Sequence, residues 1–508
     1  MAMMVLKYVQ FVMGLGKRVI NSNLKIICMK IKANLGLVSF CIISLIILNG
    51  CKNQESKNEK TVELSQDKID SLKLKEESLT QSLTWEWAKG AEGTLASGDF
   101  SSVNSKSIVT DSEGNVYVVG DFQGAKIAFD KIISNSIGDN NSWNSNIFFT
   151  KYDSKGNVKW VKIIEDYSET NLAIDSDDNI YMTCDEHFIS KYNTKGDVIW
   201  KKNTELSLIS IAINSTKGFY IIGSKDYPNR NLVKYDINGN ILWSKDLTGV
   251  NYEINSQNGQ EIQEANILVD KYGDIYLSGG YSSAKLKFGN TELNRIGLNC
   301  GSTGEACDME STNGFIIKCN PNGNVIWSKN IGETNKYNYT FFKSSATNNK
   351  GDIFLVGQSN ENSFGGTFLT KYNRAGVVQW TKNISNCNQI NHRINSVAVN
   401  SFGNVYICGF SRCESLSFGE FNETAQNGNL SFIVKYNQNG DVLCTKSLEN
   451  IASSDKKVTG NCSKVITDDL GNVFITGYYE DGGLRFGKST LSEQQQMGES
   501  FFLAKLKI

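Results

Sequence analysis

From residue 108 onward, short apolar runs alternate with polar turns. One module is an apolar strand ending in Asp or Asn, a turn with Gly, and a second strand ending in Gly, as in IVTDSEGNVYVVG at 108–120. It recurs seven times, at 108–120, 172–184, 211–223, 267–279, 345–357, 397–409 and 465–477. Asp or Asn begins such a turn by bonding its own backbone, and Gly supplies the positive φ that follows. Each copy therefore predicts two antiparallel strands joined by a tight turn.

A second module alternates with the first and reads FFTKYDSKGNVKWVK at 148–162. Further copies stand at 188–202, 231–245, 315–329, 368–382 and 432–446, and the seventh, at 502–508, stops halfway. The missing half is at the other end, where Trp85 to Lys89 matches the strand that carries Trp160. Four strands per unit and seven units predict a seven-bladed β-propeller of four-stranded blades, with the last blade closed by the N-terminal strand.

The repeats resemble the seven-bladed beta-propeller repeat (SBBP repeat) family of secreted and surface bacterial proteins. The matching features are the GN-[VI]-[YF], F-[IVL]-x-K-Y and G-[ND]-V-x-W strands, and the L-x-F-G motifs that end at Gly289, Gly419 and Gly487. The resemblance covers residues 85–508. It implies the propeller fold and says almost nothing about activity, because the repeat defines the family.

The N-terminal region predicts export and lipidation. An apolar stretch from Leu35 to Leu48 follows two lysines and ends at Cys51, in the order of a bacterial lipoprotein signal. We therefore expect a signal peptide over 1–50, with translation starting at Met29, and an acylated Cys51 as the mature N-terminus; an uncleaved anchor helix is the alternative. Residues 51–83 then form the lipidated cysteine and a flexible polar tether, and 84–508 form the propeller. These features place the protein in the cell envelope, at the outer membrane or cell surface.

The bulk charge does not indicate a nucleic-acid partner. The chain has 52 Lys and Arg against 53 Asp and Glu, a formal net charge of −1. We instead expect two kinds of partner. The acyl group would bind the membrane, and the surface of the propeller would bind an unknown protein or glycan.

No residue pattern predicts a catalytic, metal or cofactor site. The two histidines, His187 and His392, are not spaced with another ligand. Asp175 to Glu186 imitates a calcium loop, but Ile180 stands where that loop needs Gly, so a turn is the better interpretation. We therefore predict that the protein is not an enzyme and uses no cofactor.

Lysine recurs at one position of the third strand in every copy of the repeat. An anion-binding ring is one interpretation, but a Lys packed inside a blade needs a partner, so we favour a structural pair with the Asp or Asn that ends the first strand. The lysines are Lys151, Lys191, Lys234, Lys318, Lys371, Lys435 and Lys505, and the Asp and Asn residues are Asp111, Asp175, Asn214, Asp270, Asn348, Asn400 and Asp468.

Nine cysteines follow Cys51. Four of them, Cys184, Cys319, Cys408 and Cys444, stand within repeat strands and are expected to be buried thiols. The other five fall in connections and are the disulfide candidates of an exported protein: Cys300, Cys307, Cys387, Cys413 and Cys462.

Connection lengths predict where a ligand would bind. The turns within each module have constant length, whereas the connections from second to third strand range from three residues (185–187) to 35 (280–314). All of these connections emerge on one face of the propeller, here called the long-loop face, and variable loops on a rigid scaffold usually carry binding. The chief segments are 121–147, 280–314, 410–431 and 478–501, with aromatic anchors Trp143, Tyr281, Phe410, Phe421, Tyr478 and Tyr479.

We therefore expect a membrane-anchored binding or adhesion scaffold. The alternatives are a propeller enzyme acting on a polysaccharide, which would need carboxylates supplied by the loops, and a purely structural envelope protein.

Overall fold

The computed structural model describes most of the chain from Leu83 to Lys507. The described residues are 83–94, 102–137, 145–164, 170–184, 187–213, 218–225, 229–250, 262–296, 312–332, 340–359, 366–384, 392–413, 415–425, 429–452, 458–492 and 498–507. The expected signal peptide, Cys51 and the tether lie outside them. The chain divides into two compact units, before and after Thr80, and only the second is described below.

The described residues form antiparallel groups of four strands, here called blades and numbered along the chain, and two of these groups are each extended to six strands by a hairpin. Blade 1 consists of β2 (Val103–Thr110), β3 (Val116–Gln123), β6 (Ser145–Tyr152) and β7 (Val158–Ile164). Blade 2 consists of β8 (Thr170–Ile174), β9 (Ile180–Cys184), β10 (Phe188–Tyr192) and β11 (Val198–Asn203). Blade 3 consists of β12 (Ser207–Ile213), β13 (Phe219–Ser224), β14 (Arg230–Tyr235) and β15 (Ile241–Val250). Blade 4 consists of β16 (Ile262–Val269), β17 (Ile275–Tyr281), β20 (Asn313–Cys319) and β21 (Val325–Ile331).

The remaining three blades repeat this arrangement. Blade 5 consists of β22 (Thr340–Thr347), β23 (Ile353–Ser359), β24 (Gly366–Tyr372) and β25 (Val378–Ile384). Blade 6 consists of β26 (His392–Val399), β27 (Val405–Ser411), β30 (Leu430–Tyr436) and β31 (Val442–Ser447). Blade 7 consists of β33 (Thr459–Thr467), β34 (Val473–Glu480), β37 (Ser500–Lys507) and β1 (Thr84–Thr94).

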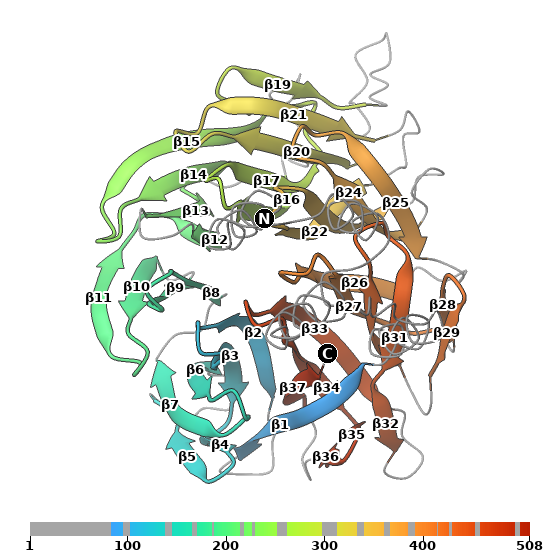
Figure 1. The fold of residues 1–508 in the computed structure, drawn as a ribbon. Helices are drawn as coiled ribbons and strands as arrows, with labels where there is room; N and C mark the ends of the chain where they lie inside the picture. The colour runs from blue at the N-terminus through green and yellow to red at the C-terminus, as the bar shows by residue number, and fades with distance from the viewer. Residues whose placement is uncertain are drawn as a thin grey trace, which may run out of the picture. The chain divides into compact units, whose positions relative to one another are not determined.

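The first strands of the blades pack against one another in a closed cyclic order. β2 contacts β8, and the series continues through β12, β16, β22, β26 and β33 back to β2. Figure 1 shows the resulting ring, with the blue β1 lying among the red strands of the C-terminus. The class predicted from the repeats, an all-β propeller of four-stranded sheets, is confirmed.

The two ends of the propeller chain meet in blade 7. Thr84 pairs with Lys507, and the antiparallel register runs on to Ala91 opposite Phe501. The outermost strand of this blade therefore comes from the N-terminal end of the propeller, and its other three strands come from the C-terminal end.

The inner turn of each blade, between first and second strand, is held by its Asp or Asn. In blade 1, Asp111 Oδ1 accepts the backbone N–H groups of Glu113 and Asn115 at 3.1 and 2.8 Å. Asp111 Oδ2 accepts the hydroxyl of Tyr117 at 2.9 Å, and Gly114 takes a φ of 75°. This set of bonds explains the constant six-residue spacing from Asp111 to Tyr117, and Asp175 and Tyr181 repeat it in blade 2.

The expected pairing of the repeated lysines with the Asp or Asn that ends the first strand is confirmed in blades 1 and 2, whereas in blades 4, 5 and 7 a carboxylate at another position pairs with the lysine, as Glu86 does with Lys505. Lys151 and Lys191 pair with Asp111 and Asp175 at 3.5 and 3.4 Å. Lys318 and Lys371 instead pair with Asp274 and Asp352, which end their inner turns four residues after the Asp or Asn that begins them. In several blades the ammonium also donates to a carbonyl of the next blade's outer turn, between third and fourth strand, such as Thr194 O at 3.3 Å from Lys151 Nζ.

A tryptophan on the outer strand of every blade except blade 6 packs against the outer turn of the next blade. The Trp160 indole donates to Thr194 O in the outer turn of blade 2, and its ring covers Gly196 so closely that a Cβ there would lie about 3.0 Å from it. The same arrangement joins Trp87 to Gly156 across the junction of blades 7 and 1. These contacts explain why Gly, Trp and the eight-residue spacing recur together.

Blade 6 departs from this pattern for a topological reason. Its Trp is replaced by Cys444, and blade 7 has no outer turn, because the two chain ends meet there. An indole at position 444 would have no turn carbonyl to bond. Leu83 lies beside Cys444 instead. The two side chains belong to one hydrophobic cluster, and the backbone of Leu83 forms a hydrogen bond with the Cys444 thiol.

The predicted buried thiols are confirmed, and one disulfide candidate is wrong. Cys184, Cys319, Cys408 and Cys444 are buried and form no disulfide. Cys462 is also a free, buried thiol, since it lies within β33 and not in a connection. Cys413 is disulfide-bonded; the candidates Cys300, Cys307 and Cys387 lie outside the described residues.

Candidate functional site

Four of the long connections contain a small β-hairpin. The hairpins are β4–β5 (Lys126–Phe129 and Ile132–Asn135), β18–β19 (Lys285–Phe288 and Thr291–Asn294), β28–β29 (Ser415–Phe418 and Phe421–Thr424) and β35–β36 (Gly482–Phe486 and Ser489–Leu491). Each turns at a residue with positive φ: Asp130, Gly289, Gly419 or Gly487. The L-x-F-G motif therefore marks three of these hairpins in the sequence. The fourth hairpin, β4–β5, has Asp130 where the motif has Gly.

Three of these hairpins join a blade to the one before it. β4 of blade 1 pairs with β1 of blade 7, β18 of blade 4 pairs with β15 of blade 3, and β35 of blade 7 pairs with β32 (Glu449–Ala452), which follows the outer strand of blade 6. The Phe of each motif is at most 2% exposed, as at Phe288 and Phe418. Much of the long connections is thus packed onto the ring and not free to move with a ligand.

Two of the predicted aromatic anchors are wrong for this reason. Tyr281 and Tyr479 are 0% and 3% exposed, and each supports the hairpin that follows it. The Tyr281 hydroxyl donates to Leu293 O at 3.4 Å, and the Tyr479 hydroxyl donates to Ser492 O at 3.1 Å. Burial raises the pKa of the Tyr281 hydroxyl well above its ordinary value. Both side chains stabilise the long-loop face from within.

The other anchors remain on or near the surface. Phe410, Phe421 and Tyr478 are half-buried in β27, β29 and β34. The Tyr478 hydroxyl accepts a hydrogen bond from Asn461 at 3.2 Å. Trp143 lies outside the described residues. The three described positions belong to blades 6 and 7, which are neighbours in the ring, so the candidate site narrows to this part of it.

A polar cluster absent from the sequence analysis lies in the same part of the ring. Glu480 ends β34, Glu499 precedes β37, and their carboxyl groups are hydrogen-bonded to each other. The Asn104 side-chain amide of blade 1 donates to Glu499 Oε2. Burial, the Glu499 charge and Asp481 together raise the pKa of Glu480. Sequence reasoning had no means of finding the pair, because its members are 19 residues apart on two sides of a connection.

The raised pKa of Glu480 predicts a pH effect on stability. The folded protein binds this proton more tightly than the unfolded chain does, so stability falls as pH rises above the ordinary value of 4.5. Glu480→Gln, which imitates the protonated form, should raise Tm at pH 7 and leave it unchanged near pH 4. Thermal melts across this range test the effect, with Glu420→Gln, at an exposed position, as the control; parallel Tm curves for wild type and Glu480→Gln would contradict it.

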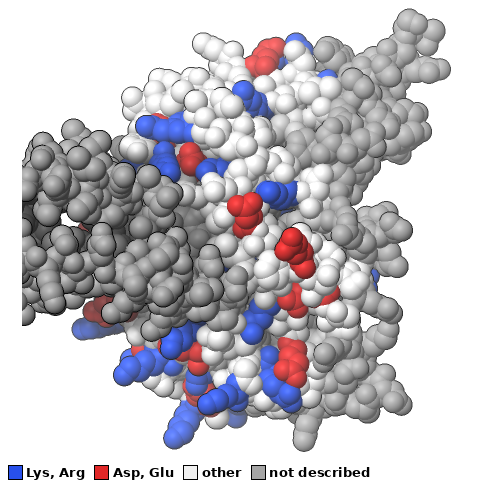
Figure 2. Space-filling model, turned by 45° about the vertical axis from the view of Figure 1, so that its right-hand side comes forward, with Lys and Arg blue, Asp and Glu red and all other residues white. Residues whose placement is uncertain are grey.

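Charges of both signs are interspersed on the face shown in Figure 2. Figure 2 shows lysines and arginines beside acidic residues, with no broad area of one sign in that view. In the described ranges no group of three or more His, Cys, Asp or Glu could hold a metal ion. No helix among the same residues is long and apolar enough to cross a membrane.

Comparisons with known proteins agree with the fold. The family described as "SBBP: Beta-propeller repeat" matches residues 93–121. A curated relative, an uncharacterized WD repeat-containing protein of Acanthamoeba polyphaga mimivirus, is 25% identical over 357 residues, which are 63% of this chain and 25% of that protein. The chain thus spans about a quarter of that relative's length. The chain is a β-propeller protein that contains an SBBP repeat.

Solved structures resemble the chain at low identity. BamB from Moraxella catarrhalis is 12% identical, with a TM-score of 0.36, covering 81% of this chain and 99% of that one. The Dos1 propeller is 9% identical, with a TM-score of 0.39 and coverage of 84% and 95%. A protein of unknown function from Bacteroides caccae is 13% identical, with a TM-score of 0.29 and coverage of 62% and 94%.

Proposed function

We propose that this protein is a lipid-anchored component of the cell envelope whose propeller binds a protein or glycan through its long-loop face. The observation that carries the proposal is the asymmetry of connection lengths. Inner and outer turns are constant and internally hydrogen-bonded, whereas the second-to-third connections vary from three to 35 residues. A rigid ring with one variable face is the usual design of a binding scaffold.

The site favoured within that face is the arc of blades 1, 7 and 6. Half-buried aromatic side chains, Phe410, Phe421 and Tyr478, belong to the same arc as the hydrogen-bonded pair Glu480 and Glu499. Aromatic groups supply contact area, and the carboxyl pair and the amide of Asn104 supply hydrogen-bonding groups that a sugar or a peptide can meet.

The carboxyl pair does not favour the polysaccharide-cleaving alternative. Glycoside hydrolases hold their two carboxyl groups about 5 Å or more apart, to leave room for the sugar and water. Glu480 and Glu499 are hydrogen-bonded to each other. A scaffold without catalysis therefore remains our proposal, and assays for release of reducing sugar from envelope polysaccharides test it.

The anchor is tested at Cys51. Metabolic labelling with a fatty-acid probe should mark the wild type and not Cys51→Ala, because the probe requires the thiol for attachment. Equal labelling of the two chains would exclude lipidation at this residue.

Binding is tested with deletions that spare the hairpins. Removing 290–312 would take away β19 (Thr291–Asn294), including the Leu293 carbonyl bonded by Tyr281, so the whole segment is not a neutral deletion. Deletions of 298–310 and 139–143 keep both hairpins. Against immobilised lipopolysaccharide, peptidoglycan fragments and purified envelope polysaccharides, we expect the wild type to bind at least one probe and the 139–143 deletion to lose about tenfold or more in affinity.

The 298–310 deletion is the matched control, because blade 4 lies outside the favoured arc. If both deletion variants bind like the wild type, the site lies elsewhere on the ring. If the wild type binds none of the probes, the alternative of a purely structural envelope protein is favoured.

A further inference from the structure

Exposed apolar side chains gather on the face opposite the long loops. This short-turn face is made of the inner turns (111–115 and its equivalents) and the outer turns (153–157 and its equivalents). Tyr272, Phe402 and Leu470 stand at the same position of three inner turns, just before the glycine, with exposed fractions of 48%, 63% and 64%. Turn tips favour Gly, Asn, Asp and Ser, so large apolar residues at these positions need another explanation.

Two of these residues lie against the inner turn of the next blade, whereas blade 5, between Tyr272 and Phe402, carries Lys350 at the same position. The Phe402 ring lies against Gly471 in the inner turn of blade 7, and Leu470 lies against Gly114 in that of blade 1. In blade 4, the Arg374 guanidinium stacks over the Tyr272 ring at 3.9 Å while it bonds Asp274 at 2.7 Å. The tips are therefore held in place and present their apolar surface to solvent.

The rim of the same face continues the apolar surface. Outer strands begin directly after the outer turns, and their first residues are exposed, as at Val198 and Ile199 in blade 2 and Ile241 and Leu242 in blade 3. Of the 13 large hydrophobic side chains exposed in the described ranges, only Ile133 and Ile137 lie on the long-loop side. A concentration of this kind marks a contact surface.

The chain also joins the propeller on this face. Third strands run from the long loops to the outer turns, so the C-terminal end of β37 lies at the short-turn face. Thr84 pairs with Lys507 at that end, and everything before Leu83 is therefore connected to the short-turn face. A flexible chain as long as 52–83 would span about 30 Å, so this face could reach the surface of the bilayer.

We propose that the short-turn face is a docking surface for a lipid bilayer. The inference rests on the proposed anchor, which would hold this face, and not the long-loop face, next to the membrane. Tyr272, Phe402 and Leu470 then enter the headgroup region, the rim residues follow, and the long loops point away from the bilayer toward their ligand. Apolar tips on a rigid scaffold are suited to such shallow insertion.

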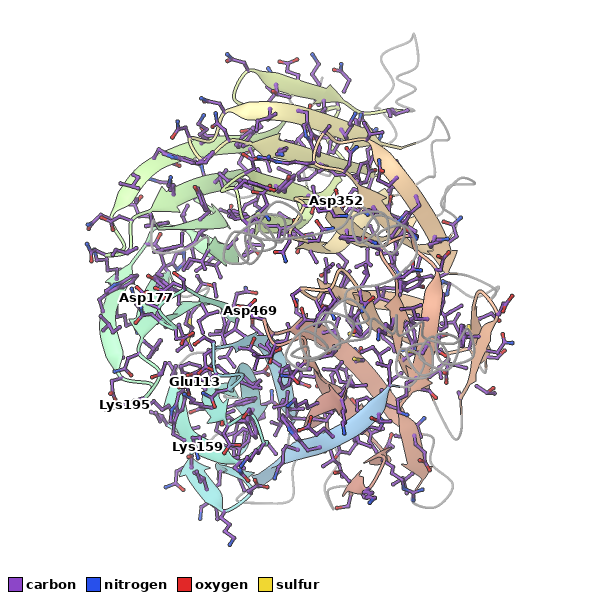
Figure 3. All side chains as sticks on the ribbon, in the orientation of Figure 1. Glu113, Lys159, Asp177, Lys195, Asp352 and Asp469 are labelled. Carbon is purple, nitrogen blue, oxygen red and sulfur yellow. The ribbon has the colours of Figure 1, made fainter. Side chains whose placement is uncertain are left out.

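Charge on the face favours an apolar contact over an electrostatic one. Lys195 and Lys159 stand on and beside the outer turns, whereas Glu113, Asp177 and Asp469 stand on inner turns nearer the middle of the ring (Figure 3). Because basic and acidic residues on this face offset each other's attraction to a charged membrane, docking should require little anionic lipid. It should also survive salt concentrations that screen surface charge.

Intrinsic tryptophans report directly on this face. The indoles of Trp160, Trp200 and Trp380 donate to outer-turn carbonyls, so they lie at its rim. The full chain is bound to phosphatidylethanolamine–phosphatidylglycerol vesicles with or without bromine on the acyl chains, and Trp emission of the vesicle-bound fraction is compared. We expect brominated lipid to quench the wild type, and the Tyr272→Ser/Phe402→Ser/Leu470→Ser variant to lose about half or more of that quenching.

An Ile133→Ser/Ile137→Ser variant is the matched control and should be quenched like the wild type. All three chains must share one Tm, which shows that the substitutions leave the fold intact. Equal quenching of the wild type and the triple variant overturns the proposal, as does a vesicle-bound wild type that brominated lipid does not quench. If the fatty-acid probe does not label Cys51, only the proposed anchor is contradicted. The quenching ratio still tests the docking surface, because it is measured on the protein that floats with the vesicles.

Discussion

Trp87→Ala is expected to lower the free energy of unfolding by about 3–5 kcal/mol, a large part of the stability of an ordinary domain. Trp87 is 8% exposed, its indole donates to Ser154 O at 3.3 Å, and its ring covers Gly156 of blade 1. The substitution removes these contacts from the strand that joins the two ends of the propeller chain. Chemical denaturation at constant pH measures the loss.

Trp200→Ala is the control, because it removes the equivalent contact between blades 2 and 3. Both variants should be destabilised, but only Trp87→Ala should speed hydrogen exchange of the β1 amides from Thr84 to Ala91, which are paired with β37. A Trp87→Ala protein that melts like the wild type, with β1 equally protected, would show that β1 does not contribute to ring closure.

Lys191→Met is expected to cost about 3 kcal/mol or more, whereas Lys435→Met is expected to cost nothing or to stabilise. Lys191 pairs at 3.4 Å with Asp175, whose side chain is 2% exposed, so its removal leaves a buried carboxylate without its cation. Lys435 is equally buried, but its inner turn offers Asn400, and among the described residues no carboxylate pairs with it. Thermal and urea unfolding at pH 7 compare the two variants.

The pH dependence of Lys435 gives an independent check. Burial lowers the pKa of Lys435 below the ordinary 10.5, so the folded state binds this proton less tightly than the unfolded chain. Wild-type stability from this residue should therefore rise with pH up to about 10.5, and the advantage of Lys435→Met should shrink over the same window. A Lys435→Met variant as unstable as Lys191→Met would show that Lys435 has an energetically important partner.

The sequence by itself determined the fold class and the local turns. The bonds that hold an inner turn join residues at most six positions apart, as between Asp111, Gly114 and Tyr117, so their spacing is visible in one dimension. The circular completion by Trp85 to Lys89 was visible for the same reason, because one repeat could be compared with the others. Buried thiols at Cys184, Cys319, Cys408 and Cys444 followed from their places in repeat strands.

Only the tertiary structure decided which residues of the long connections face solvent. Tyr281 and Tyr479 looked like surface anchors, yet they are buried under hairpins that extend or pack on other strands of the ring. The pair Glu480 and Glu499, and the placement of Cys444 beside Leu83, likewise depend on contacts between blades. Hydrogen bonds within a turn are encoded by neighbouring residues, whereas burial is set by the strand that happens to pack alongside, and the repeat pattern does not specify that strand.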